Sequence, residues 1–110
     1  SRDFTYIDNV IQANLLSLVT TNEKAINTVY NVAYGDRNTL NDLMTYLKDY
    51  LSEFDSKISN VEVVYGPNRA GDIPHSHASV DKAKELLNYN PQFSLSQGLK
   101  EAVKWYWKNL

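Results

Sequence analysis

The amino-acid sequence predicts an α/β fold in which helices pack against a small mixed or parallel sheet. Three short runs, residues 4–7, 28–34 and 61–65, are rich in β-branched and aromatic side chains, a composition typical of strands. Between and after these runs, apolar residues recur at helical spacing. The predicted order is strand, helix, strand, helix, strand, loop, helix and helix, with too few strands for a complete doubly wound domain.

The first strand leads directly into the first helix. Residues 4–7 alternate aromatic and β-branched side chains, and Asp8 or Asn9 can cap the helix because their side-chain oxygens accept from free backbone N–H groups. The polar stretch 20–24 ends the helix, and the nearly continuous apolar run 28–34 is typical of a strand covered on both faces. The apolar positions of this helix are Val10, Ile11, Leu15 and Leu18.

A turn that begins at Gly35 separates the second strand from a long amphipathic helix. Thr39 and Asp42 form a predicted capping box, with aspartate in place of the usual glutamate or glutamine. The charged side chains of this helix are expected on a solvated face, as in ordinary amphipathic helices. Its apolar positions are Leu40, Leu43, Met44, Leu47, Tyr50, Leu51 and Phe54.

Two further helices follow the third strand and a long loop. Ser79 is the predicted cap of the first of them, and Asn88 is its predicted left-handed terminator. Ser94 and Gln97 form a second predicted capping box, which opens the last helix. The side chains of the last helix that are expected to face inward are Leu95, Leu99, Ala102, Val103 and Tyr106.

Length and composition exclude several classes of function. The chain has 110 residues, which suits one small domain, and its 11 basic and 13 acidic side chains give a net charge of −2. This charge provides no broad basic surface for nucleic acid. No cysteine is present, so disulfides and thiolate metal sites are excluded, and a reducing cytoplasmic compartment is permitted. No apolar run approaches the roughly 20 residues that cross a bilayer, so no membrane partner is expected.

The loop around Arg69 holds the most informative side chains. A guanidinium offers a planar fork of donors suited to phosphate, and the carboxylate of Asp72 can accept from ribose hydroxyls. Gly71 between them allows a close approach of the backbone to a ligand. Considered by itself, this spacing is explained more simply by an ion pair between Arg69 and Asp72. Arg2 would contribute only if the fold brought it near Arg69, which would create a two-arginine clamp for a diphosphate.

Other motifs of nucleotide chemistry do not occur in the sequence. The four glycines are too dispersed for a dinucleotide-binding Gly-x-Gly-x-x-Gly, and neither a Gly-Lys-Thr phosphate loop nor a Tyr-x-x-x-Lys pair is found. His75 and His77 alternate in the loop, but zinc would need at least a third ligand. We therefore expect polar loop histidines and no metal site.

Four motifs, in order and spread over essentially the whole chain, resemble the C-terminal substrate-binding part of the extended short-chain dehydrogenase/reductase family. They are residues 1–10, residues 30–36 with Thr39 and Leu43, residues 69–73 with the helix that follows, and residues 87–91 with the tail around Trp105. The resemblance implies a nucleotide-sugar-binding domain fragment over residues 1–110, with the NAD-binding Rossmann half absent. The start at Ser1, inside the first motif, likewise predicts a piece of a longer protein.

Functional roles follow from this resemblance residue by residue. Arg2 and Arg69 match the family arginines that contact the nucleotide diphosphate, and Asp72 matches the acid that holds the ribose. Catalytic and cofactor-binding groups of the family lie in its N-terminal half, so none is assigned here. The parent enzyme is expected to use NAD, and this chain alone is expected to be inactive.

Within the family, the chain is most similar to UDP-N-acetylglucosamine 4-epimerases of the Vi-polysaccharide biosynthesis type. This similarity implies C4 epimerisation of a UDP-sugar through a transient 4-keto sugar, in a cytoplasmic enzyme that is a homodimer. Nucleotide-sugar dehydratases and decarboxylases share most of the motifs and remain alternatives. A non-catalytic interaction module, which would use exposed strands and the aromatic tail to bind a partner, is the alternative from another class.

Overall fold

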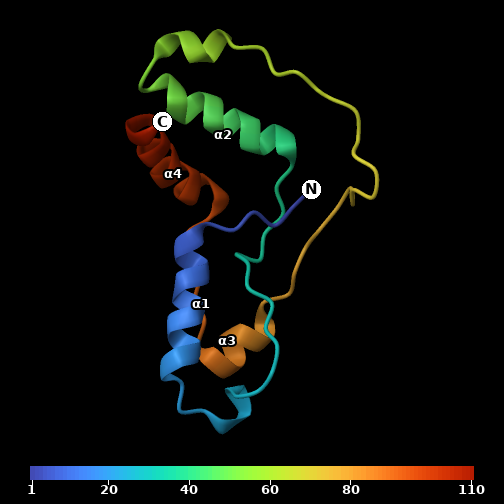
Figure 1. Ribbon diagram of the computed structural model, residues 1–110, viewed down its shortest axis with the longest axis vertical. Helices are drawn as coiled ribbons and strands as arrows, with labels where there is room; N and C mark the ends of the chain where they lie inside the picture. Colours follow the sequence, from blue (N-terminus) through green and yellow to red (C-terminus); the bar gives the residue numbers. More distant parts are fainter.

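The computed structural model describes residues 1–110 and consists of helices joined by irregular segments (Figure 1). The N-terminal segment crosses the middle of the molecule and then enters the first helix. None of the helices is long and apolar enough to span a membrane. In chain order, the elements are α1 (Ile7–Val19), η1 (Glu23–Ala25), α2 (Leu40–Ser52), η2 (Ser56–Asn60), α3 (Asp81–Leu87) and α4 (Leu95–Asn109).

The helices form two packed pairs at opposite ends of an elongated molecule. Helix α2 packs against α4 at one end, and α1 packs against α3 at the other (Figure 1). The principal extents are 53 × 33 × 20 Å, and the radius of gyration is 16.9 Å. A compact domain of this length has a radius of gyration of about 13 Å. The two pairs are therefore joined by connecting segments and do not share one central core.

The main core lies between α1, α3 and the segment that precedes α2. Small side chains dominate it, which allows the backbones of these segments to approach closely. The hydroxyl of Tyr89 donates to the carbonyl of Ala33 over 2.7 Å, so this buried polar group is satisfied. The buried residues of this cluster are Ala13, Ala33, Val80, Ala83 and Tyr89.

The three segments predicted as strands form no strand in the structure. A single antiparallel bridge joins Arg2 to Asn38, and no ladder continues from it. In residues 28–34, side chains satisfy backbone groups that a neighbouring strand would otherwise pair: Lys82 Nζ donates to Val29 O over 2.8 Å. A strand requires a partner edge, and residues 1–110 provide none for these segments. The predicted α/β sheet therefore stays a prediction.

The residues at the helix ends show how far local patterns predict structure. Both predicted capping boxes, Thr39 with Asp42 and Ser94 with Gln97, are confirmed. Asn88 is confirmed as a left-handed terminator, with φ of 58°.

The N-caps of α1 and α3 differ from the predicted residues. Helix α1 begins one residue before Asp8, and its N-cap Tyr6 makes no side-chain cap hydrogen bond. Asn9 is already inside the helix, where its side chain contacts a distant loop. Helix α3 begins after Val80 rather than after Ser79, although Ser79 Oγ accepts from the backbone N–H of Asp81, the first residue of the helix, over 3.5 Å.

Candidate functional site

The candidate site is built around Arg2, whose backbone is held in place on both sides. Arg2 N donates to Asn38 O over 2.8 Å, and Asn38 N donates to Arg2 O over 2.9 Å. The guanidinium turns back, so that Nη1 donates to Ser1 O over 2.9 Å. These contacts fix the base of the side chain and leave Nη2 free to reach toward the loop that contains Arg69.

That loop makes a tight turn which brings Arg69 and Asp72 together. Asp72 N donates to Arg69 O over 3.1 Å, and Gly71 has a φ of 77°. This φ is the value of the third residue of a type II turn, a position that favours glycine because other residues are strained there. The four turn residues line a shallow cavity of about 220 Å³.

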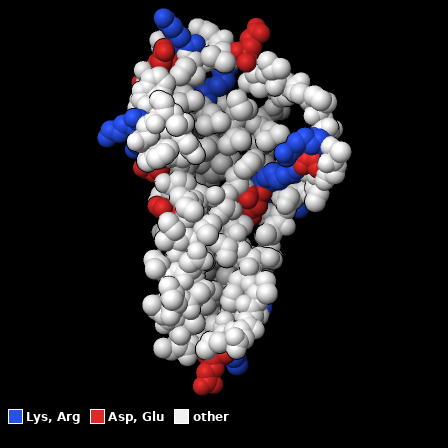
Figure 2. Space-filling model, viewed as in Figure 1, with Lys and Arg blue, Asp and Glu red and all other residues white.

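The turn places Asp72 between two guanidinium groups. Asp72 Oδ1 lies 2.7 Å from Arg2 Nη2, and Oδ2 lies 3.9 Å from Arg69 Nη2. The side chain of Arg69 is 87% exposed, while those of Arg2 and Asp72 are 32% and 36% exposed. Figure 2 shows basic and acidic atoms in contact at the edge of the molecule where this loop runs.

The structure thus brings Arg2, Arg69 and Asp72 together, although the first two lie 67 positions apart in the sequence. The simpler expectation, an ion pair of Arg69 with Asp72, is confirmed at 3.9 Å, and Arg2 makes the shorter contact to the same carboxylate, at 2.7 Å. Two guanidiniums and one carboxylate leave one excess positive charge. Exposed ion pairs of this kind contribute little to stability. The individual roles of the three residues stay predictions.

A second polar cluster, centred on Asp3, lies directly beside the first in sequence. The Asp3 side chain is only 6% exposed. It accepts from the backbone N–H of Gly35 over 3.0 Å and from that of Tyr34 over 3.3 Å. His77 Nδ1 lies 3.8 Å from Asp3 Oδ2. Sequence reasoning missed Asp3 as an anchor; the only available signal was an acidic residue beside Arg2, and its amide partners are 31 and 32 residues away.

Asp3 also acts on the buried tyrosine of the core. Burial raises the pKa of the Tyr89 hydroxyl above its ordinary value of 10.0, and the negative charge of Asp3 raises it further. The other loop histidine, His75, places its Nδ1 2.9 Å from Ser1 Oγ. No three His, Asp or Glu side chains converge in a way that could hold a metal ion.

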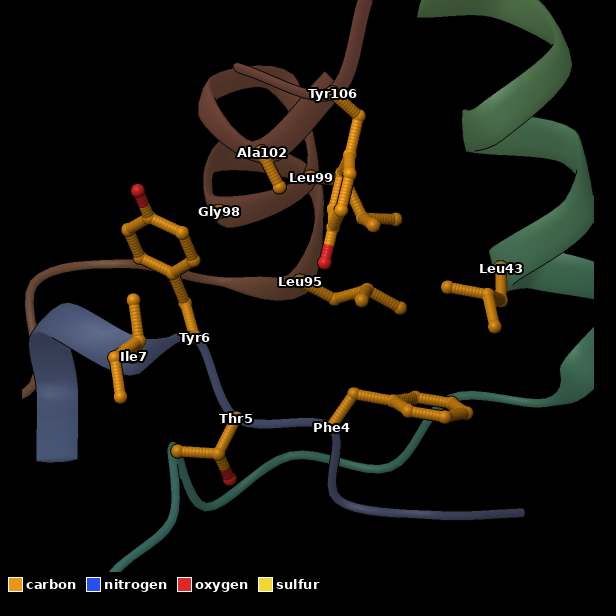
Figure 3. A pocket seen from close by; sticks show the side chains of 10 residues that line it. All are labelled: Phe4, Thr5, Tyr6, Ile7, Leu43, Leu95, Gly98, Leu99, Ala102 and Tyr106. Carbon is orange, nitrogen blue, oxygen red and sulfur yellow. The ribbon is translucent and has the colours of Figure 1, made fainter. Parts of the chain in front are cut away.

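An apolar cavity of about 330 Å³ lies between the N-terminal segment, α2 and α4 (Figure 3). Gly98 allows the close approach of Tyr6 to α4, and the Tyr6 ring packs on Phe93 at a centroid distance of 4.9 Å. Desolvation, followed by Asp8 and Glu101, raises the pKa of Tyr6. With no charged side chain in its lining, this cavity is not suited to a diphosphate. It is lined by Phe4, Thr5, Tyr6, Ile7, Leu43, Leu95, Gly98, Leu99, Ala102 and Tyr106.

Comparison with known proteins finds relatives that act on nucleotide sugars, whereas no protein-family profile matches the chain. The chain is 31% identical to UDP-glucuronate 4-epimerase 4 of Arabidopsis thaliana, over 96% of this chain and 25% of the plant protein. It is 30% identical to UDP-N-acetyl-alpha-D-glucosaminuronate decarboxylase of Bacillus cytotoxicus, over 96% of this chain and 32% of that enzyme.

A third relative is the putative UDP-glucose 4-epimerase of Methanocaldococcus jannaschii, which is 28% identical over 99% of this chain and 32% of the archaeal protein. The chain therefore spans about a quarter to a third of the length of these relatives. The similarity is to UDP-sugar epimerases and a UDP-sugar decarboxylase.

Proposed function

We propose that residues 1–110 form the nucleotide-sugar-binding domain of an NAD-dependent UDP-sugar epimerase of the extended short-chain dehydrogenase/reductase family. The observation that carries this proposal is the meeting of Arg2, Arg69 and Asp72 in one exposed cluster. The names of the relatives support it independently, because each of them names a UDP-sugar as substrate.

The chemistry of the cluster suits the UDP part of such a substrate. Guanidinium groups bind phosphate oxygens through paired, charge-assisted hydrogen bonds. Arg2, from the N-terminal segment, and Arg69, from the turn, would both bind the diphosphate. Asp72 would accept from the ribose hydroxyls, since an ionised carboxylate is only an acceptor of hydrogen bonds. The chain thereby holds the substrate by its nucleotide and contributes no group to the sugar chemistry.

The residues of this chain do not fit the NAD cofactor. A dinucleotide cradle needs several glycines close together at the N-terminus of a helix, but here Gly35 is the only glycine near the start of α2, and its φ of 96° serves a turn held by Asp3. We derive no reaction step through NAD within residues 1–110. Hydride transfer is assigned to another domain of the enzyme, and the chain alone is expected to show no turnover.

The surface of the chain supports packing against such a domain. Its solvent-accessible surface is 8167 Å², whereas a compact monomer of 12.6 kDa exposes about 6,200 Å². Four apolar side chains on one side of α1 are 45–80% exposed, and Figure 2 shows a largely uncharged surface at that end of the molecule. We propose that a further domain covers this face and provides the partner strands of the α/β sheet. The four side chains are Ile7, Ile11, Leu15 and Leu18.

The finer assignment rests on the resemblance of the four motifs. We propose C4 epimerisation of UDP-N-acetylglucosamine in polysaccharide biosynthesis, by a cytoplasmic homodimer. Decarboxylation of a UDP-sugar acid is a second candidate, favoured by the 30% identity to the Bacillus cytotoxicus decarboxylase. Product analysis after incubation of the complete enzyme with NAD and each UDP-sugar separates them: an epimer from the first reaction, carbon dioxide from the second.

The binding role is tested by replacement of Arg69. In Arg69→Ala, loss of charge-assisted hydrogen bonds of about 1.5–3 kcal/mol should weaken UDP binding about 10- to 150-fold. Isothermal titration of the purified protein with UDP measures this change. The matched control is Lys57→Ala, which removes a cation of η2 and should leave the affinity unchanged. Equal affinities of wild type and Arg69→Ala would contradict the role of Arg69. Absence of UDP binding by the wild type would favour the interaction module.

A further inference from the structure

Asp72 contacts both arginines that the proposed ligand would need, and its shorter contact is with Arg2. Its Oδ1 lies 2.7 Å from Arg2 Nη2, so the guanidinium proposed to hold phosphate already carries a carboxylate. The contact to Arg69 is much longer, at 3.9 Å, and the Arg69 side chain is 87% exposed. An incoming anion therefore meets Arg69 paired only through a contact of 3.9 Å, but finds Arg2 occupied by Asp72 at 2.7 Å.

We propose that Asp72 is a resident competitor for Arg2 which makes the site selective for nucleoside diphosphates over inorganic phosphates. This inference rests on the proposed function and adds a specificity-determining role for Asp72. Pyrophosphate would have to displace Asp72 from Arg2. The displaced carboxylate would then have no partner and would be repelled by the negative charge of the pyrophosphate. A nucleoside diphosphate displaces it too, but its ribose hydroxyls give Asp72 new donors at the same moment.

The local structure indicates which partner moves in this exchange. The backbone of Arg2 is held by two hydrogen bonds to Asn38, of 2.8 and 2.9 Å. The loop that carries Asp72 is exposed at every residue from 66 to 77. The hydrogen bonds that tie this loop to Ser1 all lie after Asp72: Ser1 N donates to Pro74 O, Ser1 Oγ lies 2.9 Å from His75 Nδ1, and Ser76 N donates to Ser1 O over 2.9 Å. Asp72 is therefore free to change partner while Arg2 stays in place.

Asp3 does not compete with a ligand for Arg2 as Asp72 does. Both of its carboxylate oxygens accept from backbone amides of Tyr34 and Gly35, and its side chain is 6% exposed. His77 faces it at 3.8 Å. The carboxylate of Asp72 is thus the acidic group that contacts the two arginines.

Titration of Asp72→Asn with pyrophosphate and with UDP tests the inference. Asparagine keeps the size of the side chain and an oxygen that accepts from ribose, but it has no charge to hold Arg2. We expect pyrophosphate to bind Asp72→Asn at least about fivefold more tightly than wild type, and UDP to gain less, so that the affinity ratio of UDP to pyrophosphate falls. Asp72→Ala should show the same gain for pyrophosphate.

The control for net charge is Asp49→Asn on α2, an exposed acidic residue in no ion pair of the structure, which should bind pyrophosphate as wild type does. Unchanged or weaker pyrophosphate binding by Asp72→Asn would overturn the inference, and so would an equal gain in Asp49→Asn. If wild type binds UDP in an Arg69-dependent way while either result is found, the proposed function stands and only the competitor role fails. If wild type does not bind UDP, the proposed function and the inference on it both fail.

Discussion

Asn9 shows at the scale of a single residue how a side chain can serve a structure in an unexpected way. Its residue type and position after the first predicted strand favour a helix cap, but its side chain is completely buried. Asn9 Oδ1 accepts from the backbone N–H of Gln92 and Phe93 over 3.0 and 3.1 Å, and Nδ2 donates to Phe93 O over 2.8 Å. The amide thus joins α1 to the segment before α4.

Replacement of Asn9 by alanine should be strongly destabilising. It removes three part-buried hydrogen bonds, each worth about 0.5–1.5 kcal/mol, so we expect a loss of about 1.5–4.5 kcal/mol in the free energy of unfolding. Urea denaturation followed by circular dichroism measures it. Gln12→Ala is the matched control, because Gln12 makes a similar pair of hydrogen bonds to the exposed Asn90, which water can replace. Equal losses in the two variants would contradict the role of burial.

The candidate site could be predicted from the sequence only as a set of residue types. Arg69 and Asp72, with a glycine between them, suit a nucleotide diphosphate by their chemistry, whereas the role of Arg2 came from the resemblance to the extended short-chain dehydrogenase/reductase family. Their order along the chain does not reveal that Asp72 contacts Arg2 more closely than its neighbour Arg69. That choice depends on the bridge between Arg2 and Asn38, which joins segments 36 residues apart.

At the scale of an element, α4 contains one position where packing overrides helix propensity. A Cβ built on Gly98 would lie 2.6 Å from the Cβ of Tyr6, closer than real atoms approach. Alanine would favour the helix by about 1 kcal/mol at an exposed position. Gly98 is buried, however, and the missing side chain is what lets the N-terminal segment cross α4.

Gly98→Ala should therefore destabilise the protein despite the better helix former. Overpacking at a closely packed contact costs about 1–3 kcal/mol, and we expect a net loss within this range. Thermal unfolding compares it with Lys100→Ala, an exposed position of the same helix whose substitution should change stability by less than about 0.5 kcal/mol. A higher melting temperature for Gly98→Ala than for wild type would show that Tyr6 does not constrain this position.

At the scale of the whole molecule, the Tyr89 hydroxyl connects the segment after α3 to the segment before α2. It donates to Ala33 O over 2.7 Å inside the core, and burial together with Asp3 raises its pKa above 10.0. Below pH 10.0, both the folded and the unfolded chain keep this proton, so the group adds no pH dependence. Above pH 10.0, the unfolded chain releases the proton first, and the free energy of unfolding falls as pH rises.

The variant Tyr89→Phe should lower stability at neutral pH by about 1 kcal/mol, because Ala33 O loses its donor. Its free energy of unfolding should fall less steeply than that of wild type above pH 10.0, since the group that loses its proton on unfolding is gone. Urea denaturation at several pH values from neutral to alkaline measures both effects. Parallel pH profiles for the two proteins would contradict the linkage.

The sequence by itself determined the features whose partners are close along the chain. The capping boxes of α2 and α4 and the left-handed end of α3 were predicted at the correct residues, because their hydrogen bonds join groups a few residues apart. Only the tertiary structure decided how Asn9, Asp3 and Asp72 are used, and that residues 4–7, 28–34 and 61–65 form no strand within residues 1–110. The physical reason is the same in each case: a buried amide, a carboxylate or an open backbone edge takes its role from the distant group that packs beside it.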